Sequence, residues 1–327
     1  MLDKNKVVVI IPAFKAKNHL ETVLTHLQNQ GYNNILVVDD CCPDETFRVA
    51  EDQNVQVLKL EFNKGVGGAF SAGLDYICDT NYFAEVMYIA KIDADDQHDP
   101  RCLESMHTLI EDTKADFVKG DRYALGREPR NQPLIRKVGN IGLTFLTKLS
   151  TGYWHLNDPL NGQFIGDIRF LKMIAKAHGF EHRYLFETSI LVSASKIRAK
   201  VLDCPNLIKY ADEESSMKVS AEFKKFAFYH FRMTAKRLWR DYFYPNFDIF
   251  CLSILLSFML PIGVTLGLYN YIYGLVFDAS TETGNIAITI ILVLMGYISL
   301  IFFMLKDHDK YKVDLNVSRF YLPPSNL

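Results

Sequence analysis

A cluster of acidic and amide side chains, Asp93-Ala94-Asp95-Asp96-Gln97-His98, follows the apolar run from Val86 to Ala90. A strand that ends in several carboxylates places hard oxygen ligands side by side at the carboxyl edge of a sheet. At such an edge Mg²⁺ or Mn²⁺ can bridge the carboxylates to phosphate oxygens, so the cluster indicates a metal-dependent diphosphate site. The alternative is an acidic strand-to-helix turn in which Asp99-Pro100 only caps the next helix.

The segments around this cluster alternate between strand and helix patterns. The β-branched runs Val7–Ile11 and Ile35–Val38 suit strands that are buried on both faces. Residues at helical spacing lie between these runs, with Gly31 as a stop: Leu20, Val23, Leu24 and Leu27. A strand over 55–60, a glycine-rich turn with a helix over 65–76 and a strand over 86–92 continue the series. The pattern predicts an α/β fold with a largely parallel sheet and ligands at the strands' carboxyl ends.

Two further features of this region suit an anionic ligand. The spacing of Gly65-Val66-Gly67-Gly68 fits neither a dinucleotide fingerprint nor a P-loop, but the preceding Asn63-Lys64 forms a loop that could contact phosphate. A tight strand-to-helix turn explains these glycines equally well. Further along the chain, Arg122 and Arg136 are the arginines that we expect to bind a phosphorylated substrate. For any single arginine the alternative is a solvated surface.

The C-terminal third contains two long stretches without charge, Ile249–Phe277 and Thr283–Leu305. Each is long enough to cross a bilayer as a helix, and the short loop between them predicts a hairpin in which Pro261 is tolerated. Lysines and arginines flank the pair and are absent from the loop, which predicts that both termini are cytoplasmic. The alternative is a pair of buried helices in a soluble domain. The segment 222–244 resembles a basic amphipathic helix at a membrane surface.

Composition excludes some classes of protein. The chain has 36 Lys and Arg against 38 Asp and Glu, so there is no electrostatic case for binding nucleic acid. The six cysteines show no paired metal-ligand spacing, and we expect them to be reduced and packed, with a redox role for Cys41-Cys42 as the alternative.

Taken in order, these motifs resemble those of the polyprenyl-phosphate glycosyltransferases, the group of dolichol-phosphate mannose synthase and the bactoprenol glucosyltransferases. The matching pieces are Ile10–Phe14, Val37–Asp40, Asn63–Gly65, Asp93–Pro100, Gly120–Tyr123, Asp158-Pro159 and Asn161-Gly162. The resemblance implies a GT-A domain over 1–220, a juxtamembrane amphipathic helix over 221–246, two transmembrane helices over 247–305 and a cytoplasmic tail over 306–327.

The resemblance also implies roles for particular residues. Base and ribose of a nucleotide-sugar donor would be held by Pro12, Ala13, Phe14 and Asp39 or Asp40, with Lys64 and Gly65 beside the donor. The metal, Mg²⁺ or Mn²⁺, would be arranged by Asp93, Asp95 and Gln97. The acceptor phosphate would meet Arg122 and Arg136, with Lys209 or Lys218 as further candidates. The chain departs from the family pattern at Lys15-Ala16 and Cys41-Cys42, where Asn-Glu and Gly-Ser are common, which affects the expected base and ribose contacts.

The implied reaction is a single inverting transfer of a sugar from a UDP- or GDP-sugar to a polyprenyl phosphate in a membrane, with the bacterial inner membrane as the expected location. Membrane-anchored members of the family favour a homo-oligomer. Two alternatives remain: a processive polysaccharide synthase and a non-catalytic membrane scaffold. Arg237-Leu238-Trp239-Arg240 is not the Gln-x-x-Arg-Trp motif of the synthases, and two spans make a poor translocation channel.

Overall fold

The computed structural model describes residues 2–80, 83, 85–124, 134–181, 183, 185–206, 219–244, 249–277, 280 and 282–310, without the side chains of 134–138, 219–224 and 249. It contains two compact units. The first ends at Phe231 and the second begins at Arg232. This boundary lies inside helix α8 (Val219–Leu238), so each unit is described by itself, and the expected domain limits at 220, 246 and 305 stay predictions.

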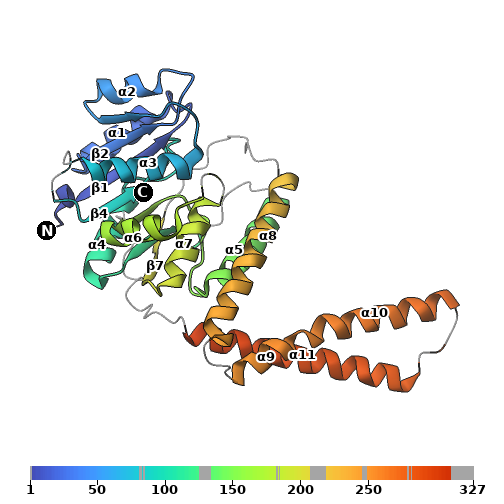
Figure 1. The fold of residues 1–327 in the computed structure, drawn as a ribbon. Coiled ribbons are helices and arrows are strands. Elements are labelled where there is room, and N and C mark those ends of the chain that lie inside the picture. The colour runs from blue at the N-terminus through green and yellow to red at the C-terminus, as the bar shows by residue number, and fades with distance from the viewer. Residues whose placement is uncertain are drawn as a thin grey trace. The chain divides into compact units, whose positions relative to one another are not determined.

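The first unit is built on a seven-stranded sheet with the order β3-β2-β1-β4-β6-β5-β7 (Figure 1). Its strands are β1 (Val7–Ala13), β2 (Ile35–Asp39), β3 (Gln56–Lys59), β4 (Tyr88–Lys91), β5 (Phe117–Asp121), β6 (Phe164–Asp167) and β7 (Val201–Pro205). Within the described sheet, only β6 runs antiparallel to its neighbours, and the other pairs are parallel. The expected α/β fold with a mostly parallel sheet is confirmed.

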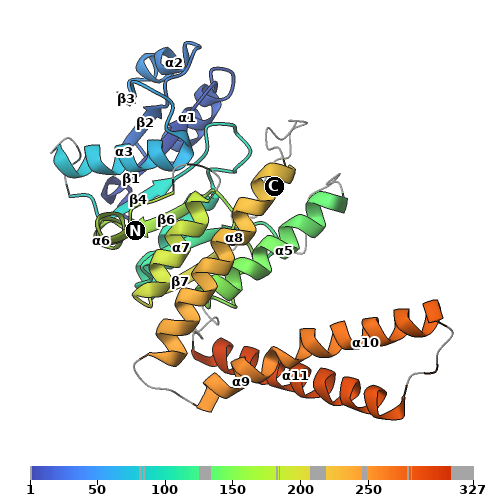
Figure 2. The ribbon, with the colours of Figure 1, turned by 45° about the vertical axis from the view of Figure 1, so that its right-hand side comes forward.

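Helices cover both faces of this sheet, as Figures 1 and 2 show. The helices of the first unit are the short 3-10 turn η1 (Lys4–Lys6), α1 (Leu20–Asn29), α2 (Thr46–Asp52), α3 (Gly65–Asp79), α4 (Cys102–Thr113), α5 (Leu134–Thr151), α6 (Ile168–His178), α7 (Phe186–Lys196) and the first part of α8. Strands alternate with helices from β1 to β5, which is the arrangement that the hydrophobic periodicity predicts.

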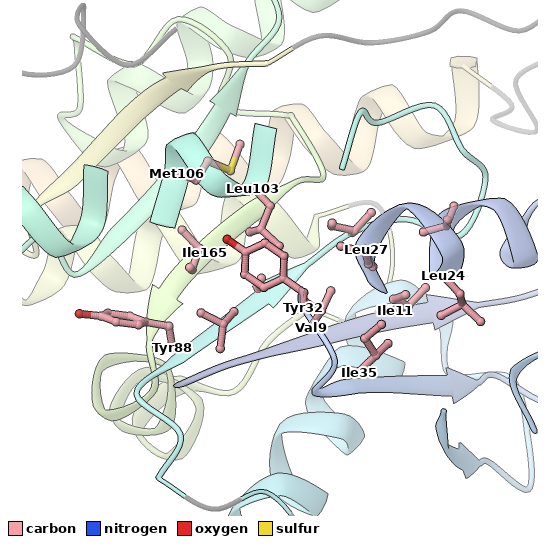
Figure 3. Packing of buried hydrophobic residues seen from close by; sticks show 14 of the residues in the cluster. Val9, Ile11, Leu24, Leu27, Tyr32, Ile35, Tyr88, Leu103, Met106 and Ile165 are labelled. Carbon is pink, nitrogen blue, oxygen red and sulfur yellow. The ribbon is translucent and has the colours of Figure 1, made fainter. Parts of the chain in front are cut away.

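The alternation of side chains along β1 assigns the helices to their faces. Val9 and Ile11 pack in one cluster with residues of α1 and α4, including Leu24, Leu27, Leu103 and Met106 (Figure 3). Ile10 points the other way, because a Cβ added at Gly73 of α3 would press against its side chain. Successive side chains of a strand face opposite sides, so α1 and α4 cover one face and α3 covers the other.

The α3 face carries an aromatic core. Phe70 of α3 lies 5.3 Å from the ring of Phe164 in β6 and 5.2 Å from the ring of Phe186 in α7, measured between centroids. Phe180 joins the same cluster at 6.0 Å from Phe70. Rings at these separations add to the stability that burial alone provides. The cluster fixes α7, and the loop that precedes α7, against α3.

The second unit contains the apolar hairpin. Its elements are the end of α8, the π-helical turn η2 (Trp239–Phe243), α9 (Ile249–Ser257), α10 (Met259–Phe277) and α11 (Thr283–Lys310). By length and composition, Phe250–Phe277 and Thr283–Lys310 could each cross a membrane, with 28 residues each. The two expected apolar helices are therefore present at the C-terminal end.

The first of these helices is interrupted, which the uncharged stretch alone does not indicate. A turn at Phe258 separates α9 from α10. Pro261 explains the break, because proline has no N–H to donate to the carbonyl of Ser257 and its ring would clash with that carbonyl. Pro261 instead lies in the first turn of α10, where a backbone N–H would have no hydrogen-bond partner within the helix.

The second helix continues beyond the uncharged stretch that ends at Leu305, up to Lys310, and a buried ion pair lies in its last turns. Both terminal nitrogens of Arg237 donate to the carboxylate of Asp307, at 2.7 Å and 2.9 Å. The hydroxyl of Tyr242 donates to the same carboxylate at 2.5 Å. Arg237, Tyr242 and Asp307 are all buried, so the pair ties the end of α8 to the end of α11.

Glycines let α10 and α11 approach closely, and this yields a prediction. A Cβ at Gly296 of α11 would overlap the backbone of Leu260, and one at Gly263 would press on Val293. We expect Gly296→Leu to lower the free energy of unfolding of the hairpin by about 1–3 kcal/mol, as overpacking does. Thermal unfolding in detergent, followed by circular dichroism, measures this loss.

Gly284→Leu is the matched control, because it lies on the same helix and, apart from that helix's own backbone, no atom of the described residues stands within 4 Å of an added Cβ there. Equal melting temperatures for the two leucine variants would contradict the packing of α10 against α11.

Candidate active site

The predicted site residues meet at one edge of the sheet because the strands that carry them are parallel. Ala13 pairs in register with Asp39, so the ends of β1 and β2 lie together. Lys91, the last residue of β4, pairs with Ile10 of β1. The loops that leave β1, β2 and β4 therefore emerge side by side, which is where ligands bind in open α/β sheets.

A pocket of about 490 Å³ opens at this edge. Seven of the predicted residues line it: Pro12, Ala13, Phe14, Asp40, Gly65, Asp93 and Asp95. Four predicted residues with described side chains are not among those that line it: Asp39, Lys64, Gln97 and Arg122. The side chain of Arg136, in the first turns of α5, and residues Lys209 and Lys218 lie outside the described part of the chain.

The two acids after β2 have structural partners. The carboxylate of Asp40 accepts the N–H groups of Lys64 at 2.6 Å and of Gly65 at 2.8 Å. It therefore caps the start of α3, where a negative charge is favoured, and Gly65 can join this turn because it adopts a φ of 75°. Asp39 accepts the N–H of Cys42 at 2.9 Å. This capping role for Asp40 was not part of the sequence prediction.

The surroundings of Cys42, the thiol beside Asp39, disfavour its thiolate form. Burial raises the pKa of Cys42 to about 12, with a further contribution from its hydrogen bond to Asp39. A thiol with such a pKa stays protonated at neutral pH, and the thiolate is the reactive form. The described cysteines form no disulfide.

Asp93 is held by a partner on each oxygen. The ammonium of Lys91 lies 2.6 Å from Oδ1 and Nε2 of His98 lies 3.3 Å from Oδ2. Burial alone would raise the pKa of Asp93, but Lys91 and His98 hold it well below the usual range of a carboxyl. Gly162 packs against this carboxylate so closely that a Cβ there would overlap Oδ2. The Asn161-Gly162 motif therefore makes room for Asp93.

Asp95 is the more available carboxylate of the two. It is half-buried, and its Oδ1 accepts the N–H of Gln97 at 3.0 Å. Burial and the neighbouring charge of Asp93 raise the pKa of Asp95, which means that a nearby cation would stabilise its charged form.

The donor set fits a divalent cation that takes part of its ligands from a substrate. Among the described residues, no group of three or more His, Cys, Asp or Glu side chains could hold a metal ion alone. Three carboxylates line the pocket, and two of them, Asp93 and Asp95, come from the loop after β4, while Asp40 caps α3. Mg²⁺ is usually bound by one or two carboxylates together with substrate phosphates and water, so the pocket has the protein ligands that such a site needs.

Arg122 is engaged by a buried acid. Its Nε and Nη2 donate to the carboxylate of Asp158 at 2.5 Å and 2.8 Å. Burial would raise the pKa of Asp158, but Arg122 holds that pKa below its usual range. The Asp158-Pro159 motif thus has a physical reason, since it supplies the partner of Arg122. A bidentate pair fixes the guanidinium and offsets its charge.

Three charged residues linked to the site, of which Lys91 and Lys119 are buried and Glu187 is half-buried, were not predicted. Lys91 is 1% exposed and bridges Asp93 to Glu187, whose Oε1 lies 3.4 Å from Nζ. Lys119 is also 1% exposed and donates to the carbonyl of Asn161, and burial lowers its pKa to about 8. The available signal was a lone lysine inside an apolar strand, at Lys91 after Tyr88-Ile89-Ala90 and at Lys119 after Phe117-Val118.

The fold and this site define a class: a GT-A-like glycosyltransferase domain. Comparison with known families agrees, because residues 8–173, half of the chain, match the model of glycosyl transferase family 2. The protein belongs to that family.

Two relatives and one solved structure illustrate the similarity. The chain is 32% identical over 235 residues to UDP-N-acetylglucosamine–dolichyl-phosphate N-acetylglucosaminyltransferase of Methanococcus voltae, covering 66% of this chain and 90% of the relative. It is 30% identical over 204 residues to undecaprenyl-phosphate mannosyltransferase of Micrococcus luteus, covering 57% and 79%. Glucosyl-3-phosphoglycerate synthase of Mycobacterium tuberculosis, in complex with Mn²⁺, UDP and phosphoglyceric acid, superposes with a TM-score of 0.51 at 14% identity over 71% of this chain and 78% of that one.

Proposed function

We propose that the protein is a membrane-bound glycosyltransferase that moves a sugar from a UDP- or GDP-sugar to a polyprenyl phosphate. The observation that carries this proposal is the pocket at the ends of β1, β2 and β4, with Asp93 and Asp95 in its wall. The relatives named above use dolichyl phosphate or undecaprenyl phosphate as their names state. The apolar helices Phe250–Phe277 and Thr283–Lys310 would keep the enzyme in the bilayer that holds such an acceptor.

The residues that line the pocket suit different parts of the donor. The backbone of Pro12, Ala13 and Phe14 at the end of β1 would bind the base and ribose. Asp95, with Asp93 behind it, would hold Mg²⁺ or Mn²⁺, which when bound offsets the charge that grows on the leaving nucleoside diphosphate. The complex of the structural neighbour with Mn²⁺ and UDP supports this choice of metal.

The acceptor needs no base to activate it. A phosphate monoester has a second pKa near ~6 and is largely dianionic at neutral pH. The protein therefore has to orient the acceptor phosphate toward the anomeric carbon and does not have to remove a proton. Arg122, held rigidly by Asp158, and Arg136 are the proposed orienting cations. A displacement in a single step inverts the anomeric configuration.

The test is transfer of label into lipid. Membranes containing the full chain are incubated with Mn²⁺, undecaprenyl phosphate and a panel of radiolabelled UDP- and GDP-sugars. A labelled, mild-acid-labile product in the organic phase supports the proposal and identifies the donor. Release of nucleoside diphosphate without labelled lipid would refute the lipid acceptor, and a water-insoluble polymer would favour a polysaccharide synthase. Neither product with any donor would favour the non-catalytic scaffold.

The basic residues around the hairpin support a cytoplasmic catalytic domain and cytoplasmic termini. We therefore expect a Ser280→Cys variant, altered in the loop between α10 and α11, to react with a membrane-impermeant maleimide in intact cells. Cys41, which is exposed in the first unit, is the internal control and should react only after permeabilisation. Labelling of Cys41 but not of residue 280 in intact cells would reverse the topology.

A further inference from the structure

Arg183 lies in the wall of the pocket, although no sequence motif drew attention to it. It belongs to the loop between α6 and α7 and lines the pocket together with Asp93, Asp95 and Gly65. Its Nη2 donates to Oδ1 of Asn63 at 3.3 Å, a long hydrogen bond to a neutral group. Among the described residues, no carboxylate forms an ion pair with it.

The loop that carries Arg183 is seated firmly on α3. A Cβ added at Gly67 would overlap the carbonyl of Glu181 and press on the ring of Phe186. The N–H of Glu181 donates to the hydroxyl of Ser189 at 3.1 Å. Only glycine at position 67 permits this approach, so the backbone of α3 and of the loop are in contact just before Arg183. Phe180 and Phe186, on either side of Arg183 in the chain, belong to the aromatic core.

Three other charged side chains at this edge have partners of opposite charge or backbone N–H partners. Asp40 is used in capping α3, and Asp93 is matched by Lys91 and His98. Arg122 is matched by Asp158. A guanidinium without a carboxylate partner beside a site for a divalent cation suits a multivalent anion, because its planar fork can form two parallel hydrogen bonds with phosphate.

We propose that Arg183 binds the diphosphate of the sugar-nucleotide donor. This inference rests on the proposed function and deepens it. Asp95 and its metal would meet the diphosphate from the end of β4, and Arg183 would meet it from the α6–α7 loop, so the negative charge of the leaving group is shared between two elements. Asn63 holds the guanidinium at the pocket before the donor arrives, which reduces the ordering that binding requires.

Binding measurements on nucleotides test the inference without relying on turnover. Detergent-solubilised full chain is titrated calorimetrically with UDP and GDP, each with Mn²⁺, and with uridine and guanosine. For the nucleotide that the wild type binds, we expect Arg183→Ala to raise the Kd of the diphosphate about 10-fold or more and to leave the Kd of the nucleoside unchanged. For Arg183→Lys, which keeps the positive charge but not the planar fork, we expect a Kd of the diphosphate between those of the wild type and of Arg183→Ala.

Arg169→Ala is the matched control. Arg169 is exposed and forms an ion pair with Asp167. Asp167 pairs in register with Tyr88, which is at the opposite end of β4 from the pocket. An unchanged Kd for the diphosphate in Arg183→Ala would overturn the inference, and so would an equal loss for diphosphate and nucleoside, because that pattern means a distorted pocket. If the wild type binds neither diphosphate, the proposed function itself fails.

Discussion

We expect Asp95→Asn to lower the rate of sugar transfer by about 10²–10³-fold while the protein stays folded. The carboxylate of Asp95 lines the pocket and accepts one N–H, that of Gln97. Asparagine has the same size and can accept that hydrogen bond through its own Oδ1. What the variant loses is the negative charge, and with it the attraction for a divalent cation at the diphosphate. Transfer of radiolabelled sugar to lipid measures the rate.

A second readout separates metal binding from turnover. The affinity for Mn²⁺ in the presence of UDP or GDP, followed by electron paramagnetic resonance, should fall in Asp95→Asn. Asp52→Asn is the control, because Asp52 is exposed at the end of α2, and its transfer rate and Mn²⁺ affinity should match the wild type. Normal Mn²⁺ affinity in Asp95→Asn would remove this residue from the metal site, even if transfer were slow.

The general position of the site could be predicted because it depends on local patterns. Apolar runs that end at Pro12, Asp39 and Asp93 indicate parallel strands, and parallel strands bring their carboxyl ends to one edge. The structure confirms this arrangement through the register of β1 with β2 and β4. Each of these predictions needed only neighbouring residues and the rule that ligands bind at that edge.

Contacts between distant segments could not be predicted in the same way. Arg122 and Asp158 are 36 residues apart, and nothing in either segment specifies that they pair. Gly67, far earlier in the chain, leaves room for the carbonyl of Glu181, two residues before Arg183. Such partners depend on how helices pack on the sheet, which a single sequence does not encode in its periodicity.

The hairpin shows the same limit. The two long stretches without charged residues predict two apolar helices, and both are present. The turn at Phe258 differs from the expectation of one helix in which Pro261 is tolerated. The rule that proline prefers the first turn of a helix would have suggested a new helix start just before it.

Lys91→Met should have the largest effect on stability. Lys91 is buried between the carboxylates of Asp93 and Glu187, at 2.6 Å and 3.4 Å. Burial would lower its pKa, but these carboxylates raise it, so the ammonium stays charged. Methionine fills a similar volume and removes only the charge, which leaves two acids without their cation. Breaking a buried pair in this way costs about 3–5 kcal/mol of the free energy of unfolding, and urea titration of the solubilised protein measures it.

A control and a pH series distinguish charge from packing. Lys59→Met removes an exposed lysine whose partner is Glu51, so it should cost under about 1 kcal/mol.

In the wild type, the lowered pKa of Asp93 means that its contribution to stability is present above its unfolded value of about 3.9 and is lost as the pH falls below it. In Lys91→Met, the ionised carboxylate of Asp93 lowers the free energy of unfolding, and protonation of that carboxyl reduces this loss.

The difference in stability between wild type and Lys91→Met should therefore shrink as the pH falls toward about 4. Adding Glu187→Gln to Lys91→Met should restore part of the loss at neutral pH, since it removes one of the two unpaired charges. A difference that is constant with pH, and a double variant no more stable than Lys91→Met, would mean that the lysine contributes by packing alone. Asp93 would then be positioned chiefly by His98 and Gly162.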